Sequence, residues 1–515
     1  MKMALDLKNH GKEYAKVFLW TFLFGIFVHI FGLVNTLSNY DDIIIQPTGV
    51  GSSLVLGRWF LRTLDILTTS LGINYNLPWL NGTVFIFFIA LSAVLVISVL
   101  GIEKRLYALI VGFAMVSFPA VTSVMFFKYT TIYYGLSLLF AAAAVWLSAR
   151  WKYAFPCSVL LLALSLGIYQ AYFPVAVTLY LLLLIKQALD EDSSFAQLVK
   201  RGVYYLVTLA AGLVLYFVIL DAYLEAVGNE LVSYQGLSTM GAISLSQYPR
   251  FIAECVKNFF LMPVNGYCSL ATGRILKGSY LVLGAISILL LALSVIKRRK
   301  TPLKALSLAL FALLLPIGIN LISIMSPDSD IYTIMVYPFV FVLCLPLLLL
   351  SGLEKAGAVR GIPTKLLGTG AVFFVSLIVA MNTYYANVNY ASIYYANRQV
   401  ENYFNSVLTQ VHMTEGYDTG KKWVILGQVD SKFFNVREWG KPHIYGGNTD
   451  AAGLANAYSR VFWMHNYMGH TAPYANVVES AAVAKLPEVA AMPTWPDYGS
   501  IKVVDEYLVI KLGEQ

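Results

Sequence analysis

Charged residues are scarce in this chain of 515 residues, since Asp, Glu, Lys and Arg make up 12% of it, against roughly a quarter of an average soluble domain. With 4 Cys and 6 His, the chain lacks the residues for a disulfide framework or a series of zinc modules. No P-loop, dinucleotide-binding glycine motif or Gly-x-Ser-x-Gly turn occurs in a suitable context. Hydrophobic residues, in contrast, reach 58%, which favours a polytopic membrane protein.

Apolar runs of roughly 18 to 22 residues recur along the chain, and each is long enough to cross a bilayer as a helix. They predict about eleven membrane-spanning helices. The fifth and sixth could instead form one longer element, with a kink at Pro174 and the short polar break at Tyr169 and Gln170. The runs lie near residues 17–34, 80–100, 107–124, 131–148, 154–169, 172–186, 202–222, 279–296, 305–325, 331–351 and 366–385.

Lys and Arg are concentrated in alternate connections between these runs, as expected for connections on the cytoplasmic side. We therefore predict a cytoplasmic N-terminus and, after an odd number of spans, an outer C-terminus. Topology then explains the net charge of +8 without nucleic acid as a partner. The basic connections contain Lys104, Arg105, Arg150, Lys152, Lys186, Lys200, Arg201, Lys297, Arg298, Arg299, Lys300, Lys304, Lys355, Arg360 and Lys365.

Two domains follow from the change in composition near residue 386. Residues 1–385 are predicted to form a transmembrane domain, and residues 386–515 a small α+β domain on the outer face. The second domain should begin with a helix over 392–412. The short apolar runs 423–426 and 507–510 predict buried strands.

The first outer connection carries the most suggestive polar residues. Asp41 and Asp42 directly follow the first span, where a carboxylate could accept a proton from a hydroxyl group or hold a divalent cation against a phosphate. The alternative is that they cap a helix or stay solvated. Arg58, Arg62 and Asp65 follow with helical spacing, and a guanidinium at the interface suits a lipid-linked phosphate. Ordinary headgroup contact is the alternative for both arginines.

Two further outer turns contain candidate residues. Lys128 stands among aromatic residues between the third and fourth spans, and its burial there would require an anionic partner. Extension of its side chain to the interface is the competing interpretation. Asp328 and Asp330 lie in a compact turn and could hold a cation or bind sugar hydroxyls, although Pro and Asp also simply favour turns.

A series of short motifs resembles a known family. The order is Asn39-Tyr40-Asp41-Asp42, Gly57-Arg58-Trp59, and then Ser165-Leu166-Gly167-Ile168-Tyr169-Gln170. This order is similar to that of the Gtr type II glucosyltransferases of O-antigen modification and serotype conversion, and the resemblance runs from about residue 15 to about residue 400. It implies a GT-C fold and a multi-pass protein of the bacterial inner membrane, whose C-terminal domain is periplasmic or extracellular.

The resemblance also implies an activity, namely transfer of a glucosyl group from a polyprenyl-phosphate donor to an O-antigen or other surface glycan. Asp41 or Asp42 would be the catalytic base, and Arg58 or Lys128 would neutralise the departing phosphate. Arg62, Tyr169, Gln170, Asp328 and Asp330 are further candidates for substrate binding. No cofactor is certain, and a divalent cation remains open because metal dependence differs among GT-C enzymes.

A flippase or transporter of lipid-linked glycans is the alternative from another functional class. Such a protein would place charges or broken helices near the midplane of the bilayer. Here the spans contain almost no charge, and the polar candidates lie at the predicted outer face. This distribution favours an enzyme.

Overall fold

The structure, a computed structural model, describes residues 2–45, 47–50, 53–232, 244–298, 300–327, 329–355, 357, 362–434 and 444–514. Asp328 therefore lies outside the described residues. The chain forms two compact units. Unit 1 comprises residues 1–34, 49–387 and 442–447, and unit 2 comprises residues 35–48, 388–441 and 448–515. Residues 35–48, which were expected in the membrane domain, belong to unit 2.

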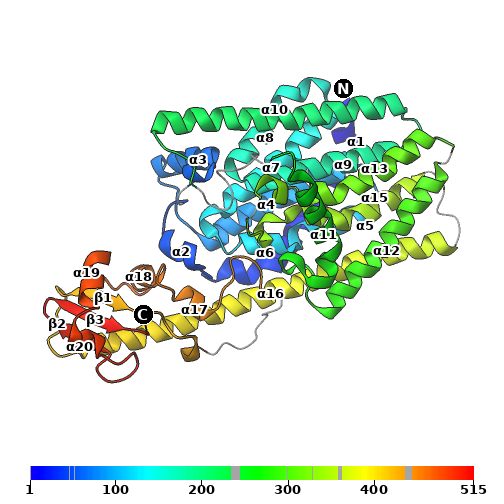
Figure 1. Ribbon diagram of the computed structural model, residues 1–515. Helices are drawn as coiled ribbons and strands as arrows, with labels where there is room; N and C mark the ends of the chain where they lie inside the picture. The colour runs from blue at the N-terminus through cyan, green and yellow to red at the C-terminus, as the bar shows by residue number, and fades with distance from the viewer. Residues whose placement is uncertain are drawn as a thin grey trace. The chain divides into compact units, whose positions relative to one another are not determined.

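Unit 1 is a bundle of apolar helices (Figure 1). Its longer helices are α1 (Lys2–Val34), α3 (Trp59–Ser70), α4 (Pro78–Leu100), α5 (Arg105–Ser117), α7 (Lys128–Arg150), α8 (Phe155–Ile168), α9 (Phe173–Leu189), α10 (Phe195–Val227), α11 (Tyr248–Asn265), α12 (Arg274–Lys297), α13 (Pro302–Ile319), α15 (Phe341–Lys355) and the first part of α16 (Ile362–His412). Short helices connect them: η1 (Leu54–Leu56), α6 (Pro119–Val124), η2 (Lys152–Ala154), η3 (Gln170–Tyr172), η5 (Tyr267–Ser269), α14 (Ile322–Met325), η6 (Thr333–Met335) and η7 (Tyr337–Val340).

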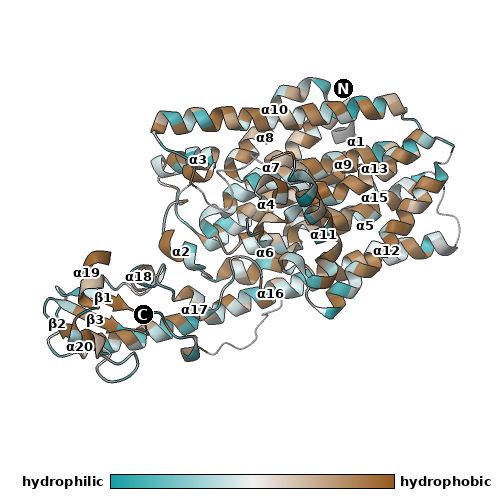
Figure 2. Ribbon diagram, viewed as in Figure 1, coloured by the Kyte–Doolittle hydropathy of each residue, from teal (hydrophilic) through white to brown (hydrophobic). Residues whose placement is uncertain are grey.

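The surface of unit 1 is apolar along several helices, as a bilayer requires (Figure 2). Large hydrophobic side chains such as Leu206 on α10, Ile288 on α12 and Leu313 on α13 are exposed. Among the described residues, ten helices are long and apolar enough to cross a membrane. The chain is therefore a multi-pass helical membrane protein, as its composition predicts.

The remaining apolar helix, over Lys152–Ile168, has 17 residues and is shorter than the other ten. Tyr169 adopts an extended conformation after it, so α8 and α9 are separate elements rather than one kinked helix. Arg150 at the end of α7 donates a hydrogen bond to the carbonyl oxygen of Ser98, and Lys186 near the end of α9 donates one to Val99. The helices α7 and α9 thus end beside the same part of α4, at the same end of the bundle. Because α8 lies between them in the chain, it must cross the bundle from this end to the opposite one.

The basic connections of unit 1 lie at one common end. Lys104 forms a salt bridge with Glu354, and Lys355 forms one of 2.8 Å with Glu103. Arg298 donates a hydrogen bond of 2.8 Å to the carbonyl oxygen of Ala188. We call this end, where α4, α7, α9, α12 and α15 terminate, the basic end of unit 1. The alternation of Lys and Arg along the sequence therefore corresponds to a real grouping in space.

Unit 2 contains a three-stranded sheet with the order β1-β3-β2. The strands expected at 423–426 and 507–510 are confirmed as β1 and β3. Strand β3 pairs parallel with β1 and antiparallel with β2. Strand β2 was not predicted. The elements of unit 2 are α2 (Tyr40–Ile45), the second part of α16, β1 (Lys422–Leu426), η8 (Ser431–Phe433), α17 (Ala451–Leu454), α18 (Arg460–Phe462), η10 (Trp463–Tyr467), α19 (Val477–Val483), α20 (Pro487–Ala490), β2 (Ile501–Val504) and β3 (Tyr507–Lys511).

The core of unit 2 forms where α16 packs on the sheet. Phe404 and Val411 of α16 are buried with Trp423 of β1 and Leu508 of β3. Ile43 of α2 is also fully buried in this cluster. Burial of an apolar side chain such as Ile stabilises a fold by roughly 1.5–3 kcal/mol. The segment directly after the first span is thus anchored in the core of unit 2.

Candidate functional site

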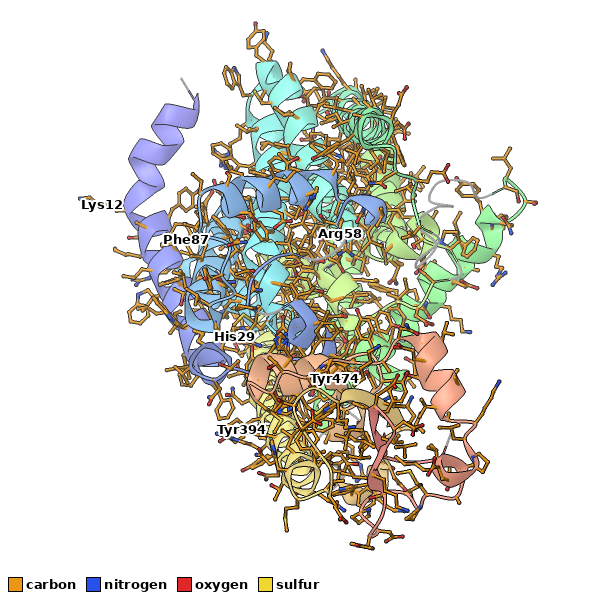
Figure 3. The ribbon with its side chains drawn as sticks, turned by 90° about the vertical axis from the view of Figure 1, so that its left-hand side faces the viewer. Lys12, His29, Arg58, Phe87, Tyr394 and Tyr474 are labelled. Carbon is orange, nitrogen blue, oxygen red and sulfur yellow. The ribbon has the colours of Figure 1, made fainter. Side chains whose placement is uncertain are left out.

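Arg58 occupies a tight turn that precedes α3 (Figure 3). Gly57 has φ of +71°, a conformation that glycine adopts without steric strain, and it ends η1. Arg58 then forms the N-cap of α3, and its backbone N–H donates a hydrogen bond of 3.0 Å to the carbonyl oxygen of Ser53. The turn fixes the backbone from which the half-buried Arg58 side chain extends.

The side chain of Arg58 lies over an aromatic ring. Its guanidinium carbon is 5.4 Å from the centroid of the Tyr169 ring, which is within the range of a cation–π interaction. Tyr169 in turn stacks on Tyr134 of α7 at 4.1 Å. The Tyr169 ring thus covers one flat face of the guanidinium. The N–H groups point outward in the plane of the guanidinium and away from the ring.

Gln170 and Tyr216 hold the turn from the other side. The Gln170 side-chain amide donates a hydrogen bond of 3.0 Å to the carbonyl oxygen of Leu56. The Tyr216 hydroxyl donates one of 3.0 Å to the carbonyl oxygen of Gly57. Tyr169 and Gln170, for which the sequence suggested only substrate binding, therefore both contact the Gly57-Arg58 turn. The sequence analysis missed Tyr216, a polar ring within an apolar span.

Two motifs far apart in the sequence meet at this point. A Cβ atom added to Gly167 would lie 2.7 Å from the Trp59 ring, so glycine permits the close approach of α8 and α3. The motif 57–59 and the motif 165–170 thus pack directly against each other. The two motifs therefore form one packed structure.

Lys128 begins α7, the helix that also carries Tyr134. Its side chain is 3% exposed, so it does not extend to the surface of unit 1. The Asn81 side chain donates a hydrogen bond of 3.1 Å to the carbonyl oxygen of Lys128. Lys128 therefore contributes a buried cation at the end of the bundle that also contains Arg58.

The acidic pair belongs to unit 2. Asp42 is fully buried, whereas Asp41 is half-buried. The Asn39 side chain accepts a hydrogen bond of 2.8 Å from the backbone N–H of Asp42 and so caps the first turn of α2. Of the two carboxylates, Asp41 is therefore the one that a substrate can reach more easily.

Residues of the C-terminal tail hold this acidic segment. The Tyr467 hydroxyl forms a hydrogen bond with the Ser38 hydroxyl. The Asn397 side chain donates a hydrogen bond of 3.1 Å to the carbonyl oxygen of Ser38, and the Asn466 side chain donates one of 2.8 Å to that of Ile43. Asn466 and Tyr467 lie in η10, a π-helical turn, and such turns occur frequently at functional sites.

The charge of Asp42 also affects the pKa of Tyr467. Burial, and next the negative charge of Asp42, raise the pKa of Tyr467 above its ordinary value. The hydroxyl therefore stays protonated at neutral pH and remains a hydrogen-bond donor beside the acidic pair. The sequence analysis missed Tyr467 because more than 420 residues separate it from Ser38.

The other candidates are less well placed. Arg62 forms a salt bridge of 2.9 Å with Asp65, and its side chain is 45% exposed. Asp330 is exposed on a loop. Among the residues that the structure describes, which exclude Asp328, no group of three His, Cys, Asp or Glu side chains could hold a metal ion.

A comparison with known families gives a match that covers more than half of the chain. The family described as glucosyl transferase GtrII matches residues 30–343. The matched region includes Asp41, Asp42, Arg58, Lys128 and Gln170, but not the tail residues that hold the acidic segment. No curated protein and no solved structure matches the chain.

Proposed function

This chain belongs to the GtrII glucosyl transferase family, and from that premise we propose that it transfers a glucosyl group from a polyprenyl-phosphate donor to an O-antigen or other surface glycan. The observation that carries the proposal is the packing of the turn at Gly57-Arg58 against Tyr169 and Gln170. It presents a guanidinium at the end of an apolar bundle, and a guanidinium suits the phosphate of a lipid-linked sugar because its fork donates two parallel hydrogen bonds.

The reaction proceeds by direct displacement at the anomeric carbon. The bond between this carbon and the phosphate oxygen breaks while the acceptor oxygen forms a new bond from the opposite side. The electron pair leaves on the phosphate, where Arg58 and the buried Lys128 stabilise the developing negative charge. The acceptor's proton passes to a carboxylate of the acidic pair. This course inverts the anomeric configuration.

Asp41 is the proton acceptor in this proposal, and Asp42 is its positioning partner. Asp41 is half-buried, so an acceptor hydroxyl can approach it. Asp42 is fully buried beside Tyr467. Adjacent residues on a helix point in different directions, which allows one carboxylate to face the substrate while the other faces the core.

The architecture that we propose is of the GT-C type, in the bacterial inner membrane, with eleven crossings. Ten long helices and the returning α8 support this number. The concentration of Lys and Arg at the basic end favours a cytoplasmic location for that end. With a cytoplasmic N-terminus and an odd number of crossings, unit 2 lies outside.

Cysteine labelling tests this orientation. Tyr498 of unit 2 is 99% exposed, and Lys200 near the start of α10 is exposed at the basic end. In a Cys157→Ser background, Tyr498→Cys should react with an impermeant maleimide at the outer face of the inner membrane of intact cells. Lys200→Cys should react only after lysis. The reverse pattern would contradict the proposed orientation.

A transfer assay tests the reaction. The purified chain is incubated with polyprenyl-phosphate glucose and with glycan from cells that lack this chain. We expect release of polyprenyl phosphate together with a glucosylated product of inverted configuration. Parallel reactions with EDTA or added Mg²⁺ measure dependence on a divalent cation. A flippase would release no polyprenyl phosphate in this assay, and that result would contradict the proposal.

A further inference from the structure

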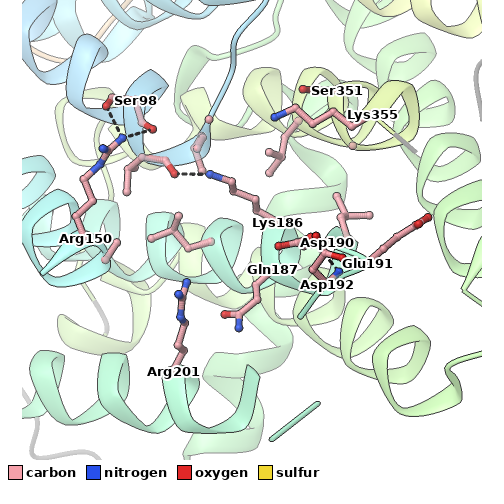
Figure 4. Close-up of a pocket in the computed structure, with 18 of the residues that line it drawn as sticks. Ser98, Arg150, Lys186, Gln187, Asp190, Glu191, Asp192, Arg201, Ser351 and Lys355 are labelled. Carbon is pink, nitrogen blue, oxygen red and sulfur yellow. Dashed lines mark hydrogen bonds between the residues drawn. The ribbon is translucent and has the colours of Figure 1, made fainter. Parts of the chain in front are cut away.

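A cavity of about 560 Å³ opens at the basic end of unit 1. Its walls come from the ends of α4, α7, α9 and α15 and from the beginning of α10, as Figure 4 shows. Cavities of this size are typical of binding sites for small molecules. It lies at the opposite end of α7 from Lys128, and a helix of 23 residues is about 34 Å long. The cavity is therefore separate from the candidate active site.

Lys186 reaches into this cavity through a gap that a glycine leaves open. Its ammonium group donates a hydrogen bond of 2.9 Å to the carbonyl oxygen of Val99. Gly101 ends α4 with φ of +66°, and a Cβ atom added there would lie 2.6 Å from the Lys186 ammonium nitrogen. A side chain at this position would displace the Lys186 ammonium from where it lies. The end of α4 thus accommodates the Lys186 ammonium.

Two guanidinium groups share the cavity with Lys186 (Figure 4). The Arg150 side chain donates hydrogen bonds of 2.9 and 2.8 Å to the carbonyl and hydroxyl oxygens of Ser98. These bonds orient the Arg150 fork at the end of α7. Arg201 extends from α10 and interacts with the Tyr205 hydroxyl. Three cations from three helices therefore line one cavity.

The three carboxylates of the lining, Asp190, Glu191 and Asp192, interact with Lys304, a cation outside the lining. Glu191 forms an ion pair with Lys297 at 3.8 Å, and the carboxylate of Asp190 accepts a hydrogen bond from the backbone N–H of Asp192. Lys355, a fourth cation of the lining, pairs with Glu103. Among the described residues, neither Lys186 nor Arg201 forms a salt bridge with a carboxylate. Like charges in one cavity repel each other, and an anion between them would relieve that repulsion.

We propose that this cavity binds the phosphate group of an anionic ligand, with Lys186, Arg150 and Arg201 as its cationic contacts. An ammonium group and two guanidinium forks match the oxygens of a phosphate. The ligand is either a phospholipid headgroup, which basic cavities between membrane helices bind, or a soluble phosphate, because both present the same phosphate group. Nothing in this proposal depends on the transfer reaction.

The matched pair Arg201→Gln and Lys200→Gln tests the proposal. Both changes remove one positive charge from neighbouring exposed positions of α10, but only Arg201 lines the cavity. The full chain is purified in neutral detergent, and its thermal unfolding midpoint is followed against inorganic phosphate, with chloride at equal ionic strength as the reference. A second series uses nanodiscs of phosphatidylcholine with and without phosphatidylglycerol.

We expect a saturable rise of the midpoint in at least one series. A rise with inorganic phosphate identifies a soluble ligand, and a rise with phosphatidylglycerol alone identifies a headgroup. Arg201→Gln should weaken the apparent affinity roughly tenfold, as loss of one charge-assisted contact does, and Lys200→Gln less than twofold. If Lys186→Gln folds, it should weaken the apparent affinity as much as Arg201→Gln does. If it does not fold, the comparison of Arg201→Gln with Lys200→Gln decides the outcome.

Two results would overturn the proposal. One is the absence of any rise beyond that with chloride or phosphatidylcholine in both series. The other is an equal loss of affinity in Lys200→Gln and Arg201→Gln, which would indicate a diffuse effect of surface charge. Transfer activity of Arg201→Gln should equal that of the unmodified chain, so a failure here is distinguishable from a failure of the proposed reaction.

Discussion

The connection that follows the first span divides into two halves with different surroundings. Residues 35–48, which carry the acidic pair, belong to unit 2, and residues 54–70, which carry Arg58, belong to unit 1. Hydroxyl and amide groups of the tail hold the acidic half. In the arginine half, the Gln170 amide and the Tyr216 hydroxyl of the bundle donate hydrogen bonds to backbone carbonyl oxygens of the turn, and the Tyr169 ring lies against Arg58.

This difference shows that closeness in sequence does not make one structural unit. In our proposal, the carboxylate acts on the acceptor glycan and the guanidinium acts on the lipid phosphate. Under this proposal each group is held by the unit suited to its substrate, since a glycan is water-soluble and a polyprenyl chain is not. Variants of the two halves should consequently affect different substrates.

The largest effect is expected for Asp41→Asn, which keeps the size of the side chain but removes its ability to accept a proton. Turnover should fall by about two to four orders of magnitude, the usual contribution of a positioned base. Asp42→Asn should reduce turnover less, because it disturbs only the packing beside Tyr467. The control is Asp330→Asn on an exposed loop, which should change turnover less than twofold. Turnover at the unmodified rate in both Asp41→Asn and Asp42→Asn would exclude a role of the pair in catalysis.

A smaller effect is expected for Arg58→Ala, because it removes charge-assisted hydrogen bonds to the donor. Such bonds contribute about 1.5–3 kcal/mol, or roughly 10- to 150-fold in kcat/KM. The fall in kcat/KM should appear when the donor concentration is varied and not when the acceptor concentration is varied. Arg58→Lys should restore part of it, since the charge returns without the fork. An equal fall in kcat/KM for donor and acceptor would contradict the assignment of the two halves to different substrates.

Tyr467→Phe should lower kcat about tenfold and leave KM for the donor unchanged, because the acidic segment loses its hydrogen bond at Ser38. Burial and the charge of Asp42 raise the pKa of Tyr467, so its hydroxyl keeps its proton well beyond neutral pH. The activity of the unmodified chain should therefore show no decline from ionisation of Tyr467 up to about pH 10, its ordinary value. A decline below that pH which Tyr467→Phe abolishes would contradict this protonation state.

The smallest effect is expected for Arg62→Gln. Arg62 is 45% exposed and pairs with Asp65, and exposed ion pairs contribute about 0–1 kcal/mol to stability. Activity should change less than twofold, in contrast to Arg58→Gln, the same substitution one helical turn earlier. Similar losses in both variants would show that a general positive charge, rather than the geometry at Arg58, binds the donor.

Much of this arrangement could be predicted from the sequence because its signals are local. Apolar runs of sufficient length predicted the spans, and alternating Lys and Arg predicted the grouping at the basic end. Short apolar runs predicted β1 and β3. The motif around Tyr169 and Gln170 was recognised, but its contact with the turn at Arg58 has no local signal.

The residues that hold the acidic pair were not predictable in the same way. Tyr467 and Asn397 lie hundreds of positions from Ser38, and no pattern in either segment indicates the other. The assignment of residues 35–48 to unit 2 depends on these contacts and on the burial of Ile43. Residues 35–48 were expected in the membrane domain because they follow the first span directly. Hydrophobic periodicity does not detect the long-range contacts that place them in unit 2.

The shortness of the helix over Lys152–Ile168 has a consequence for the surrounding lipid. Its 17 residues rise about 26 Å, whereas the hydrocarbon layer measures about 30 Å. A segment shorter than the layer draws the bilayer thinner around it, at a modest elastic cost. Leu160 of this helix is exposed at the surface of unit 1, and α8 packs on α3, which begins directly after Arg58. We expect membrane thickness to influence transfer, so that reconstitution into shorter-chain lipids should favour the reaction.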